Sequence, residues 1–474
     1  MKKNIVAAFA LVFALASCNS QLDDINTNPN ATEHPLPAYL LTGTLKQGAD
    51  LYWGADNNFN SSLLFVQQWA KIQYTEPDRY DVSNTSFTTL WNTGYATLIT
   101  DLNTILNFTD EEAHSNYKGV ALALRSWVFQ LLTDAYGDIP YSEAGQKTTP
   151  KYDAQRDVYL GLLNDLKTAQ SLLSTSGEKI EGDVVYDGSI AKWKKFVNSL
   201  RLRIALRIGD RESDLAKQEV TAVVADAAGL IDSNASNCQF IYTRSPKQNP
   251  ASAWFETRDD FRVSKTLVDK LKALSDPRLA VYAQLPTDES VTTYVGAANG
   301  LSNSEANNQG FAKTSKPGTY FLTSESPAVI LSYAEVQFSL AEAVARGFIS
   351  GNADTYYKEG ITASLKQFGV TDATVILTYL SQPAVLYNAA NYKESIGLQK
   401  WIAFYGQGLD AFAEWRRLDY PQLTAGVSTV LDGEMPSRFF YPGTEQSLNG
   451  INYQLAVSSQ GPDLLTTRLW FDVN

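Results

Sequence analysis

The side chains that most often carry catalysis are scarce in this chain of 474 residues. It has two histidines, His34 and His114, and they form no His-x-x-x-His pattern of the kind that binds zinc. A Ser-His-Asp triad would need one of these two histidines, and no Gly-x-Ser-x-Gly segment is present. Glycine loops of the Walker A or Gly-x-Gly-x-x-Gly type are also missing. Cys238, without a suitable histidine, is a weak nucleophile candidate. We therefore predict that the protein is not an enzyme.

Acidic pairs keep one hydrolytic chemistry open, because a glycosidase needs only two carboxylates. The pairs in question are Asp259-Asp260 and Asp183 with Asp187. The second pair could also give oxygen ligands to a calcium ion, although no EF-hand pattern appears. Acidic residues are abundant, so a solvated charged loop is the simpler interpretation of both pairs. We predict no catalytic residue and no cofactor, with a structural calcium as the exception left open.

Cys18 is the residue with the clearest predicted chemistry. A positive N-terminus and an apolar run over residues 5–16 have the form of a signal peptide, and the run is too short to span a bilayer. Leu15-Ala16-Ser17-Cys18 is similar to the lipobox of bacterial lipoproteins. There the signal is cut before the cysteine, whose thiol carries a diacylglycerol and whose amino group is acylated, for example with palmitate. We predict a signal peptide over 1–17 and a lipidated tether over 18–35, with a plain secretory signal as the alternative.

The overall charge narrows the choice of partners. The formal net charge is −12, which argues against a nucleic acid and against a polybasic membrane patch. No later segment has about 18 consecutive apolar residues, so no transmembrane helix is predicted. If Cys18 is lipidated, Cys238 has no partner for an internal disulfide, and the protein must depend on its core for stability.

Aromatic side chains in loop-like stretches are the candidates for ligand contact. The chain has 25 Tyr, 21 Phe and 9 Trp; most should lie in the core, but rings in polar loops can bind ligands. Sugars stack their C–H faces on such rings, each contributing about 1 kcal/mol beyond burial, and bind polar side chains at the rim. Peptides would use backbone pairing and side-chain pockets. The predicted ligand-binding residues are Trp53, Asp56 and Asn57 in "LYWGADNN", Tyr74, Asp78, Arg79 and Tyr80 in "YTEPDRYD", and Trp254, Tyr294, Tyr320 and Phe321 farther along. Alternatively, these residues seal the scaffold.

Helical periodicity dominates the elements that must position these side chains. One helix is predicted in 109–137, with Thr109 and Glu112 as a capping box and Gly137 as its stop. Others are predicted over 189–209, over 328–347 with Ser326 as cap, over 353–369, and over 395–417 with a bend at Gly406 and Gly408. Further helices are expected near 37–51, 61–73, 86–107, 154–174, 213–228 and 264–274. Neighbouring helices joined by short turns predict stacked hairpins.

Two long polar segments interrupt the helices. Residues 232–262 and 286–326 are rich in Gly, Ser, Asn and Pro with isolated rings, and loops of such length in a compact protein are usually functional or disordered. The tail over 432–474 is expected to be irregular and packed on the scaffold. Trp127, Trp193, Trp401 and Trp415 lie on apolar helical stripes and should be core residues. Arg201, Arg203, Arg207, Arg416 and Arg417 should pair with acids between helices.

The sequence resembles the SusD/RagB family of outer-membrane nutrient-binding lipoproteins of Bacteroidetes. The resemblance covers nearly the whole mature chain in the family's order, and it looks closest to the branch with an Asn-Pro-Asn start and a Tyr-Gly-Asp-Ile-Pro-Tyr block. It is carried by "LDDINTNPNAT" (22–32), "RSWVFQLLTDAYGDIPYSEA" (125–144), "KWKKFVNSLRLRIALR" (192–207), "DFRVSKTLVDKLKALSDPRL" (260–279), "SYAEVQFSLAEAVARG" (332–347), "QKWIAFYGQGLDAFAEWRRLDYP" (399–421) and "SRFFYP" (437–442).

This resemblance implies a mostly α-helical fold with four tetratricopeptide-like helix pairs, long irregular loops and a few short strands. It implies one such domain over 36–474, with ligand-loop insertions around 232–262 and 286–326. The protein would sit at the cell surface, anchored in the outer membrane by its lipid. It would cap a SusC-like TonB-dependent β-barrel transporter and deliver a bound oligosaccharide or peptide to it. Asp23-Asp24 is similar to surface-export signals of these bacteria. No sugar-contact motif of the family maps onto the predicted site residue by residue.

Two other functions remain open at this point. One is a surface enzyme that cleaves glycans, which new reducing ends would reveal. The other is a scaffold that supports the transporter without binding a ligand itself, in which case the loop aromatics would seal the transporter interface.

Overall fold

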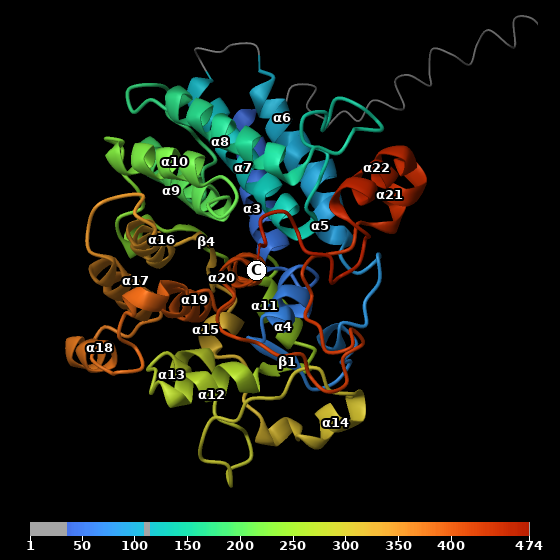
Figure 1. The fold of residues 1–474 in the computed structure, drawn as a ribbon, viewed down its shortest axis with the longest axis vertical. Coiled ribbons are helices and arrows are strands. Elements are labelled where there is room, and N and C mark those ends of the chain that lie inside the picture. Colours follow the sequence, from blue (N-terminus) through green and yellow to red (C-terminus); the bar gives the residue numbers. More distant parts are fainter. Residues whose placement is uncertain (1–35, 109–113, 474) are drawn as a thin grey trace, which may run out of the picture.

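The computed structural model describes residues 36–108 and 114–473. The fold is mostly α-helical, as predicted, with a few short strands (Figure 1). The signal peptide, the tether with Cys18, Asp23-Asp24 and His34, and the capping box of Thr109 and Glu112 lie outside the described residues. None of the described helices is long and apolar enough to cross a membrane. The single domain over 36–474 stays a prediction.

The helical scaffold is a series of hairpins stacked beside one another. Antiparallel pairs are formed by α7 (Ser115–Tyr136) with α8 (Gln155–Leu172), α9 (Ile190–Arg207) with α10 (Ser213–Ala225), and α16 (Tyr333–Ala345) with α17 (Ala353–Gln367). The first helices, α3 (Pro37–Trp53) and α6 (Thr100–Leu106), pack beside α7. Figure 1 shows the later pairs following one another from α7 and α8 toward α18 (Ala373–Leu380). This arrangement matches the stacked hairpins expected from the sequence.

The shorter elements lie beside this scaffold. They are α4 (Leu63–Phe65), α5 (Thr88–Thr93), α11 (Pro250–Phe255), α12 (Lys265–Ala273), α13 (Leu279–Tyr282), α14 (Asn303–Asn308), α15 (Thr319–Leu322), α21 (Gly443–Leu448) and α22 (Gly450–Gln460). Two antiparallel strand pairs complete the fold: β1 (Trp69–Lys71) with β3 (Phe261–Val263), and β2 (Cys238–Phe240) with β4 (Ala328–Leu331). The long predicted loops thus contain short helices and strands of their own.

The helix predicted over 328–347 begins later than expected. Residues Ala328–Leu331 are a buried strand, β4, which pairs with Cys238–Phe240. The helix starts at Tyr333, and its cap is Ser332, whose side chain accepts a hydrogen bond from the Glu335 amide. The predicted cap at Ser326 was therefore wrong, because the apolar start of this segment is a buried strand and not a helical stripe.

The helix predicted over 395–417 is divided into two. The first part, α19 (Tyr392–Ala403), ends before Gly406, whose φ of +90° is a conformation that side-chain-bearing residues rarely adopt. The second part, α20 (Gly408–Leu418), starts just after it. The two glycines therefore mark a break between helices and not a bend within one.

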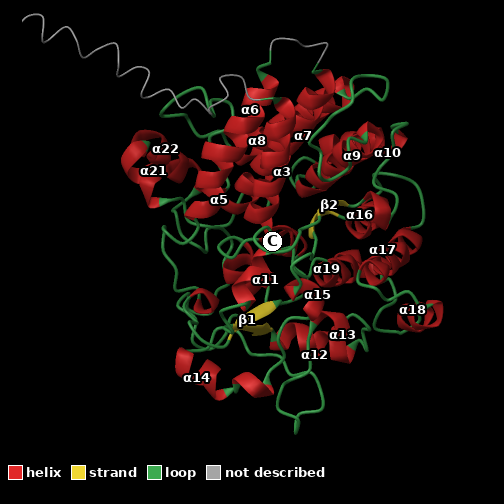
Figure 2. Ribbon diagram, turned by 180° about the vertical axis from the view of Figure 1, so that it is seen from behind, coloured by secondary structure: helices red, strands yellow, loops and turns green. Residues whose placement is uncertain are grey.

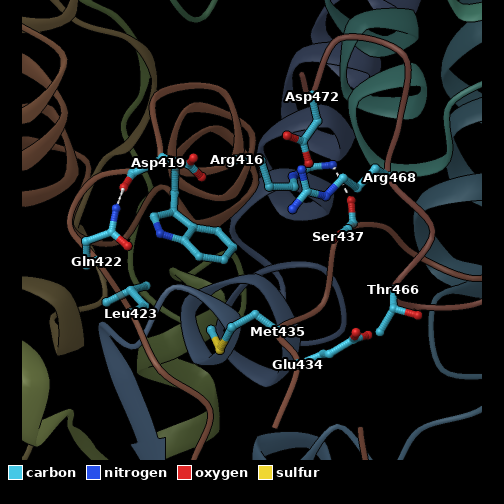
Figure 3. Close-up of a pocket in the computed structure, with 11 residues that line it drawn as sticks. Arg416, Asp419, Gln422, Leu423, Glu434, Met435, Ser437, Thr466, Arg468 and Asp472 are labelled. Atoms are coloured by element: carbon cyan, nitrogen blue, oxygen red, sulfur yellow. Dashed lines mark hydrogen bonds between the residues drawn. The ribbon is translucent and has the colours of Figure 1, made fainter. Parts of the chain in front are cut away.

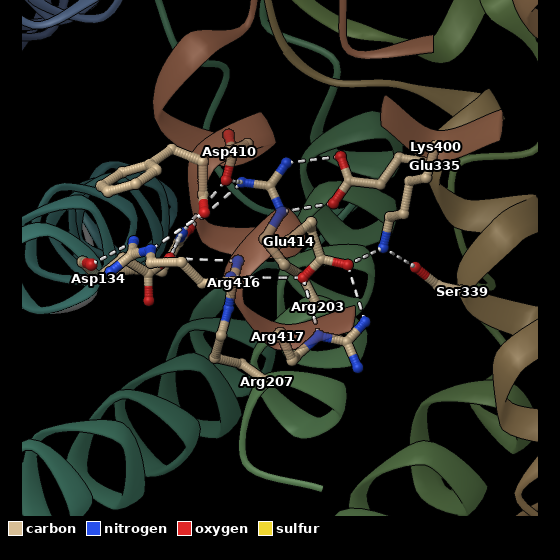
Figure 4. A network of polar contacts seen from close by, with 12 residues as sticks. Asp134, Arg203, Arg207, Glu335, Ser339, Lys400, Asp410, Glu414, Arg416 and Arg417 are labelled. Atoms are coloured by element: carbon tan, nitrogen blue, oxygen red, sulfur yellow. Dashed lines mark hydrogen bonds and ion pairs between the residues drawn. The ribbon is translucent and has the colours of Figure 1, made fainter. Parts of the chain in front are cut away.

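The predicted core tryptophans and interhelical arginines lie where the sequence places them. Trp127, Trp193 and Trp401 are buried, whereas Trp415 is half-buried at the edge of a hollow. Arg201 pairs with Glu219 at 2.8 Å. Arg203, Arg207 and Arg417 pair with acids in a buried ionic network at the centre of the helices (Figure 4). Arg416 lies beside them but donates to backbone carbonyls where an acidic partner was predicted.

Acids from α20 and α16 meet the cations of α9 in this network. Arg203 of α9 binds both oxygens of Glu335 at 2.6 and 2.7 Å and lies 3.2 Å from Asp410 of α20. Arg207 lies 3.2 Å from Asp134 of α7 and 3.4 Å from Glu414 of α20. The two contacts of Arg207 are ion pairs and not hydrogen bonds.

Glu414 is the acid on which several cations converge. Burial opposes its ionisation, but Arg417, Lys400 and Arg207 hold its pKa well below the ordinary value. Arg416 differs from its neighbours, because its guanidinium donates to the backbone carbonyls of Phe412, Ser437 and Asp134. Four elements distant in sequence are therefore joined by charge at one place.

Candidate ligand platform

The candidate site begins at the short helix α11 in the first irregular segment. Asn249 caps this helix by accepting a hydrogen bond from the Ala251 amide, and Pro250 occupies its first position. After the helix the backbone makes one more turn, with the Arg258 amide donating to the Trp254 carbonyl at 3.1 Å. Arg258 therefore stands four residues, or about one helical turn, after Trp254. The chain then enters β3, which pairs with β1; Figure 2 shows α11 close to β1.

A buried ion pair holds the indole of Trp254. Its Nε1 donates to Oδ1 of Asp260 at 2.8 Å, and the other oxygen of Asp260 lies 2.6 Å from Nζ of Lys71. Both charged side chains are nearly inaccessible to solvent. Burial lowers the pKa of Lys71, and Asp260 only partly opposes this shift. Phe59 packs edge-to-face against the indole, with ring centres 5.5 Å apart. Buried side chains therefore fix the position of the Trp254 ring.

The outer side of this group is formed by Tyr74 and Arg258. The guanidinium carbon of Arg258 is 4.5 Å from the ring centre of Trp254 and 5.8 Å from that of Tyr74. The side chain of Tyr74 is 56% exposed, and Arg258 is exposed as well. We call Tyr74, Trp254 and Arg258 the aromatic platform. It offers the exposed ring of Tyr74 for stacking and the N–H donors of Arg258 beside it, a combination suited to carbohydrate binding.

The backbone beside the platform is conformationally strained. Tyr74 has a φ of +54°, and Gln67 and Tyr80 have φ values of +52° and +64°. Left-handed backbone in residues other than glycine is uncommon and tends to gather at functional sites, where the surrounding structure must hold it. Three such residues therefore lie in the segment that presents Tyr74.

Five of the predicted ligand-contact residues are buried in this structure, which argues against their contact with a ligand. They are Trp53, Asn57, Asp78, Tyr80 and Phe321, each at most 3% exposed. Helix α3 extends to Trp53, which places the indole on its buried face in a stack with Phe321. The other side chains are committed to internal hydrogen bonds: Asn57 to the Leu51 carbonyl, Asp78 to Asn299, and Tyr80 to the sulfur of Met435.

The remaining predicted residues lie nearer the surface but not at the platform contacts. Asp56 is exposed and accepts a hydrogen bond from Thr89. Arg79 donates to the Ser428 carbonyl at 2.7 Å. Tyr294 is half-buried against the core, and Tyr320 packs on Phe368 at 5.3 Å between ring centres. Of the predicted set, Tyr74 and Trp254 are the two that Arg258 brings together.

Three of the four acids proposed for catalysis or calcium, Asp183, Asp259 and Asp260, have structural partners. Asp259 pairs with Arg262 at 2.7 Å and Lys316 at 3.0 Å, while Asp260 holds Lys71. Asp183 accepts hydrogen bonds from the amides of residues 185, 186 and 188 and from the Trp193 indole. Its two oxygens therefore stabilise a loop. In the part of the chain that the structure describes, no group of three His, Cys, Asp or Glu side chains is placed to hold a metal ion. The calcium stays an untested prediction.

A second hollow, of about 290 Å³, lies where the C-terminal segment passes α20 (Figure 3). Its wall is mostly charged and polar, and the Trp415 indole is bound to the Pro421 carbonyl. Arg416 reaches this wall, but its guanidinium already serves three carbonyls. The platform is the better candidate because the exposed ring of Tyr74 stands beside the exposed Arg258, whereas the indole at this hollow is half-buried and bound to a backbone carbonyl.

Comparison with known proteins decides the family. A family description, "starch-binding associating with outer membrane", matches residues 29–442 under the name SusD-like. The chain belongs to the SusD-like family. Among proteins with curated descriptions, none matches the sequence.

Solved structures agree with this assignment. The SusD-like chain is 32% identical to a structure titled chitin-binding protein, with a TM-score of 0.84, covering 93% of this chain and 100% of that one. A SusD homolog from Bacteroides uniformis is 26% identical, with a TM-score of 0.84 and coverage of 92% and 100%. A chitin-binding SusD homolog from Flavobacterium johnsoniae is 24% identical, with a TM-score of 0.82 and coverage of 92% and 99%; at this identity the likeness concerns the fold.

Arg258 is the platform residue of this SusD-like chain that sequence reasoning missed. It lies inside the segment 232–262 that was singled out for its rings, four residues after Trp254. That spacing was the available signal, because residues four apart share one face when the chain continues a helical turn. The short helix that creates this geometry is too brief to produce a periodic pattern.

Proposed function

We propose that this SusD-like protein binds a nutrient glycan at the outer-membrane surface and delivers it to a SusC-like TonB-dependent transporter. The observation that carries the binding part is the aromatic platform, in which the exposed ring of Tyr74 and the half-buried ring of Trp254, from distant segments, share one guanidinium. Sugar rings stack on such faces, whereas a peptide would look for an open strand edge. Membership of a family described as starch-binding supports a glycan over a peptide.

The titles of similar structures indicate which glycans to test first. Two similar structures carry titles that name chitin binding, and one of them is 32% identical along nearly the whole chain. Oligosaccharides of N-acetylglucosamine are therefore one set of ligands to test, and starch-type oligosaccharides are the other. Titration calorimetry with both sets tests binding, and a platform variant that loses all binding locates it.

Attachment and delivery are proposed on separate grounds. The Cys18 motif supports a lipid anchor, and the family's description associates it with the outer membrane. We propose an outward-facing, lipid-anchored position as the lid of the transporter. A C-terminally tagged protein should be isolated from native outer membranes in mild detergent. Recovery of a large β-barrel in roughly equal amount supports delivery to a transporter; recovery of the lipoprotein alone contradicts it.

A glycan-cleaving enzyme is the alternative that the same material can test. Asp259 and Asp260 are ion-paired and Asp183 accepts hydrogen bonds from its loop, and this favours binding without cleavage. Incubation with oligosaccharides should give no new reducing ends. If reducing ends appear in proportion to protein and disappear when Asp259 and Asp260 are both changed to Asn, the enzyme interpretation replaces ours.

A further inference from the structure

The charge of Arg258 is not neutralised by the carboxylates around it. Asp260 is paired with Lys71, and Asp259 is shared by Arg262 and Lys316. Glu256, on the same turn, accepts a hydrogen bond from the Gln248 amide at 2.7 Å. Within residues 36–108 and 114–473, no carboxylate lies within ion-pair distance of Arg258. Within these ranges, its guanidinium contacts the rings of Trp254 and Tyr74.

This arrangement leaves an oriented guanidinium at the surface. Stacking over Trp254 at 4.5 Å places the planar group against the ring and limits the directions in which its N–H groups can donate. A planar guanidinium is the side chain best suited to bind a carboxylate through two parallel hydrogen bonds. The exposed ring of Tyr74 stands beside it and can carry the C–H face of a sugar.

We infer that the aromatic platform selects glycans that carry a carboxylate, with a uronic acid unit stacked on Tyr74 and its carboxylate held by Arg258. This inference rests on the proposed function, since it names the ligand class of the same site. The protein as a whole does not attract an acidic sugar. The net charge of −12 repels anions at long range, so recognition of an acidic sugar must come from a local cation within about one Debye length, roughly 8 Å.

A neutral ligand would interact with Arg258 in a different way. An N-acetyl group would also accept a hydrogen bond from the charged Arg258, but it would lack the attraction between two opposite charges. A carboxylate adds that attraction and a second, parallel hydrogen bond to the guanidinium. The acid and its neutral ester should therefore bind with clearly different affinities, whereas for a neutral acceptor the charge of the ligand would be irrelevant.

The test is titration calorimetry on the mature chain with trigalacturonate and trimannuronate, each against its methyl ester, and with tri-N-acetylchitotriose. At least one acid should bind about tenfold more tightly than its ester, a difference of about 1.4 kcal/mol. In Arg258→Gln this preference should disappear, and in Arg258→Lys part of it should remain. Arg244→Gln is the matched control, because Arg244 is an exposed arginine of the same segment that pairs with Glu325. Melting temperatures confirm that each variant is folded.

The outcomes separate the inference from the proposed function. Equal binding of acid and ester, or binding of the neutral chitotriose alone, overturns the carboxylate inference and leaves glycan binding intact. An acid preference that persists in Arg258→Gln also overturns it, because another cation would then be responsible. If none of these glycans and no starch-type oligosaccharide binds, the proposed function of the platform fails together with the inference.

Discussion

The indole of Trp254 and the carboxylate of Asp260 are joined by a 2.8 Å hydrogen bond, and Asp260 is at the same time the partner of the buried Lys71. The indole of the platform is thus oriented by an ion pair that is buried behind it. This relationship separates two roles, stability and recognition, which substitutions can test independently.

Replacing Asp260 with Asn should lower stability more than it lowers binding. Asn retains an oxygen for the Trp254 indole but leaves Lys71 without its counter-charge, and breaking a buried pair costs roughly 3 to 5 kcal/mol. Urea unfolding measures the cost. The double variant Lys71→Met with Asp260→Asn should recover part of it. A loss below about 1 kcal/mol in the single variant would contradict this account.

Replacing Tyr74 with Ala should weaken glycan binding without lowering the melting temperature. The ring is 56% exposed, so its removal leaves little cavity, while the lost stacking should raise the Kd about five- to tenfold. Tyr39→Ala removes a ring that is 74% exposed at the start of α3 and serves as the control. An unchanged Kd in Tyr74→Ala would remove Tyr74 from the site.

Replacing Glu414 with Gln should destabilise the scaffold strongly. Lys400, Arg207 and Arg417 would then lose an acid that is ionised in the folded protein, at a cost of roughly 3 to 5 kcal/mol. The control is Asp269→Asn, which breaks the exposed Lys265–Asp269 pair and should cost at most about 0.5 kcal/mol. Comparable losses in both variants would show that the interior position is unimportant.

Asp78 should make stability fall between about pH 4 and pH 7. Burial raises its pKa to about 7, although the amide of Lys71 and the side chain of Asn299 donate to it. The folded protein therefore holds a proton that the unfolded chain releases near pH 4, so ionisation opposes folding as the pH rises. Relative to Asp78→Asn, wild-type stability should fall by a few kcal/mol over this interval. A pH-independent difference between the two proteins would mean that Asp78 is ionised throughout.

Replacing Cys18 with Ser should move the protein out of the membrane fraction. A thiol is needed for the diacylglycerol, and the described helices offer no membrane span. Fractionation and labelling with a palmitate analogue measure the change, and wild-type protein should retain both signals. Continued recovery of the Ser variant in the outer membrane would show that another element holds it there.

Long helices were predictable because the spacing of their apolar residues indicates which face is buried. In α7, the apolar residues around Trp127 mark the buried face and Gly137 marks the C-terminal end. In α9, the apolar residues around Trp193 mark the buried face. Short elements were not predictable in this way. The strand at Ala328–Leu331 has the composition of a buried helix, and its pairing with Cys238–Phe240 depends on residues far away in sequence.

The candidate site was predicted in part for the same reason. Loop composition placed Tyr74 and Trp254 in the candidate set, but it could not distinguish them from Trp53 and Phe321, which stack on each other in the core. That stack joins two segments separated by most of the chain. Exposure of a ring is a tertiary property, and a single sequence carries no direct record of it.

The ionic network also constrains the order in which the molecule can assemble. An array of helical hairpins can in general fold pair by pair, each on its neighbour. Here Arg207 is paired with both Asp134 and Glu414, and Arg203 is paired with Asp410. The early hairpins therefore depend on α20, a helix close to the C-terminus. Before α20 arrives, closing those hairpins would bury charges without their full set of partners, at a cost of several kcal/mol. The scaffold therefore resembles a repeat protein in its architecture, but its core should fold cooperatively, as one unit. The core should form fully only when α20 has docked.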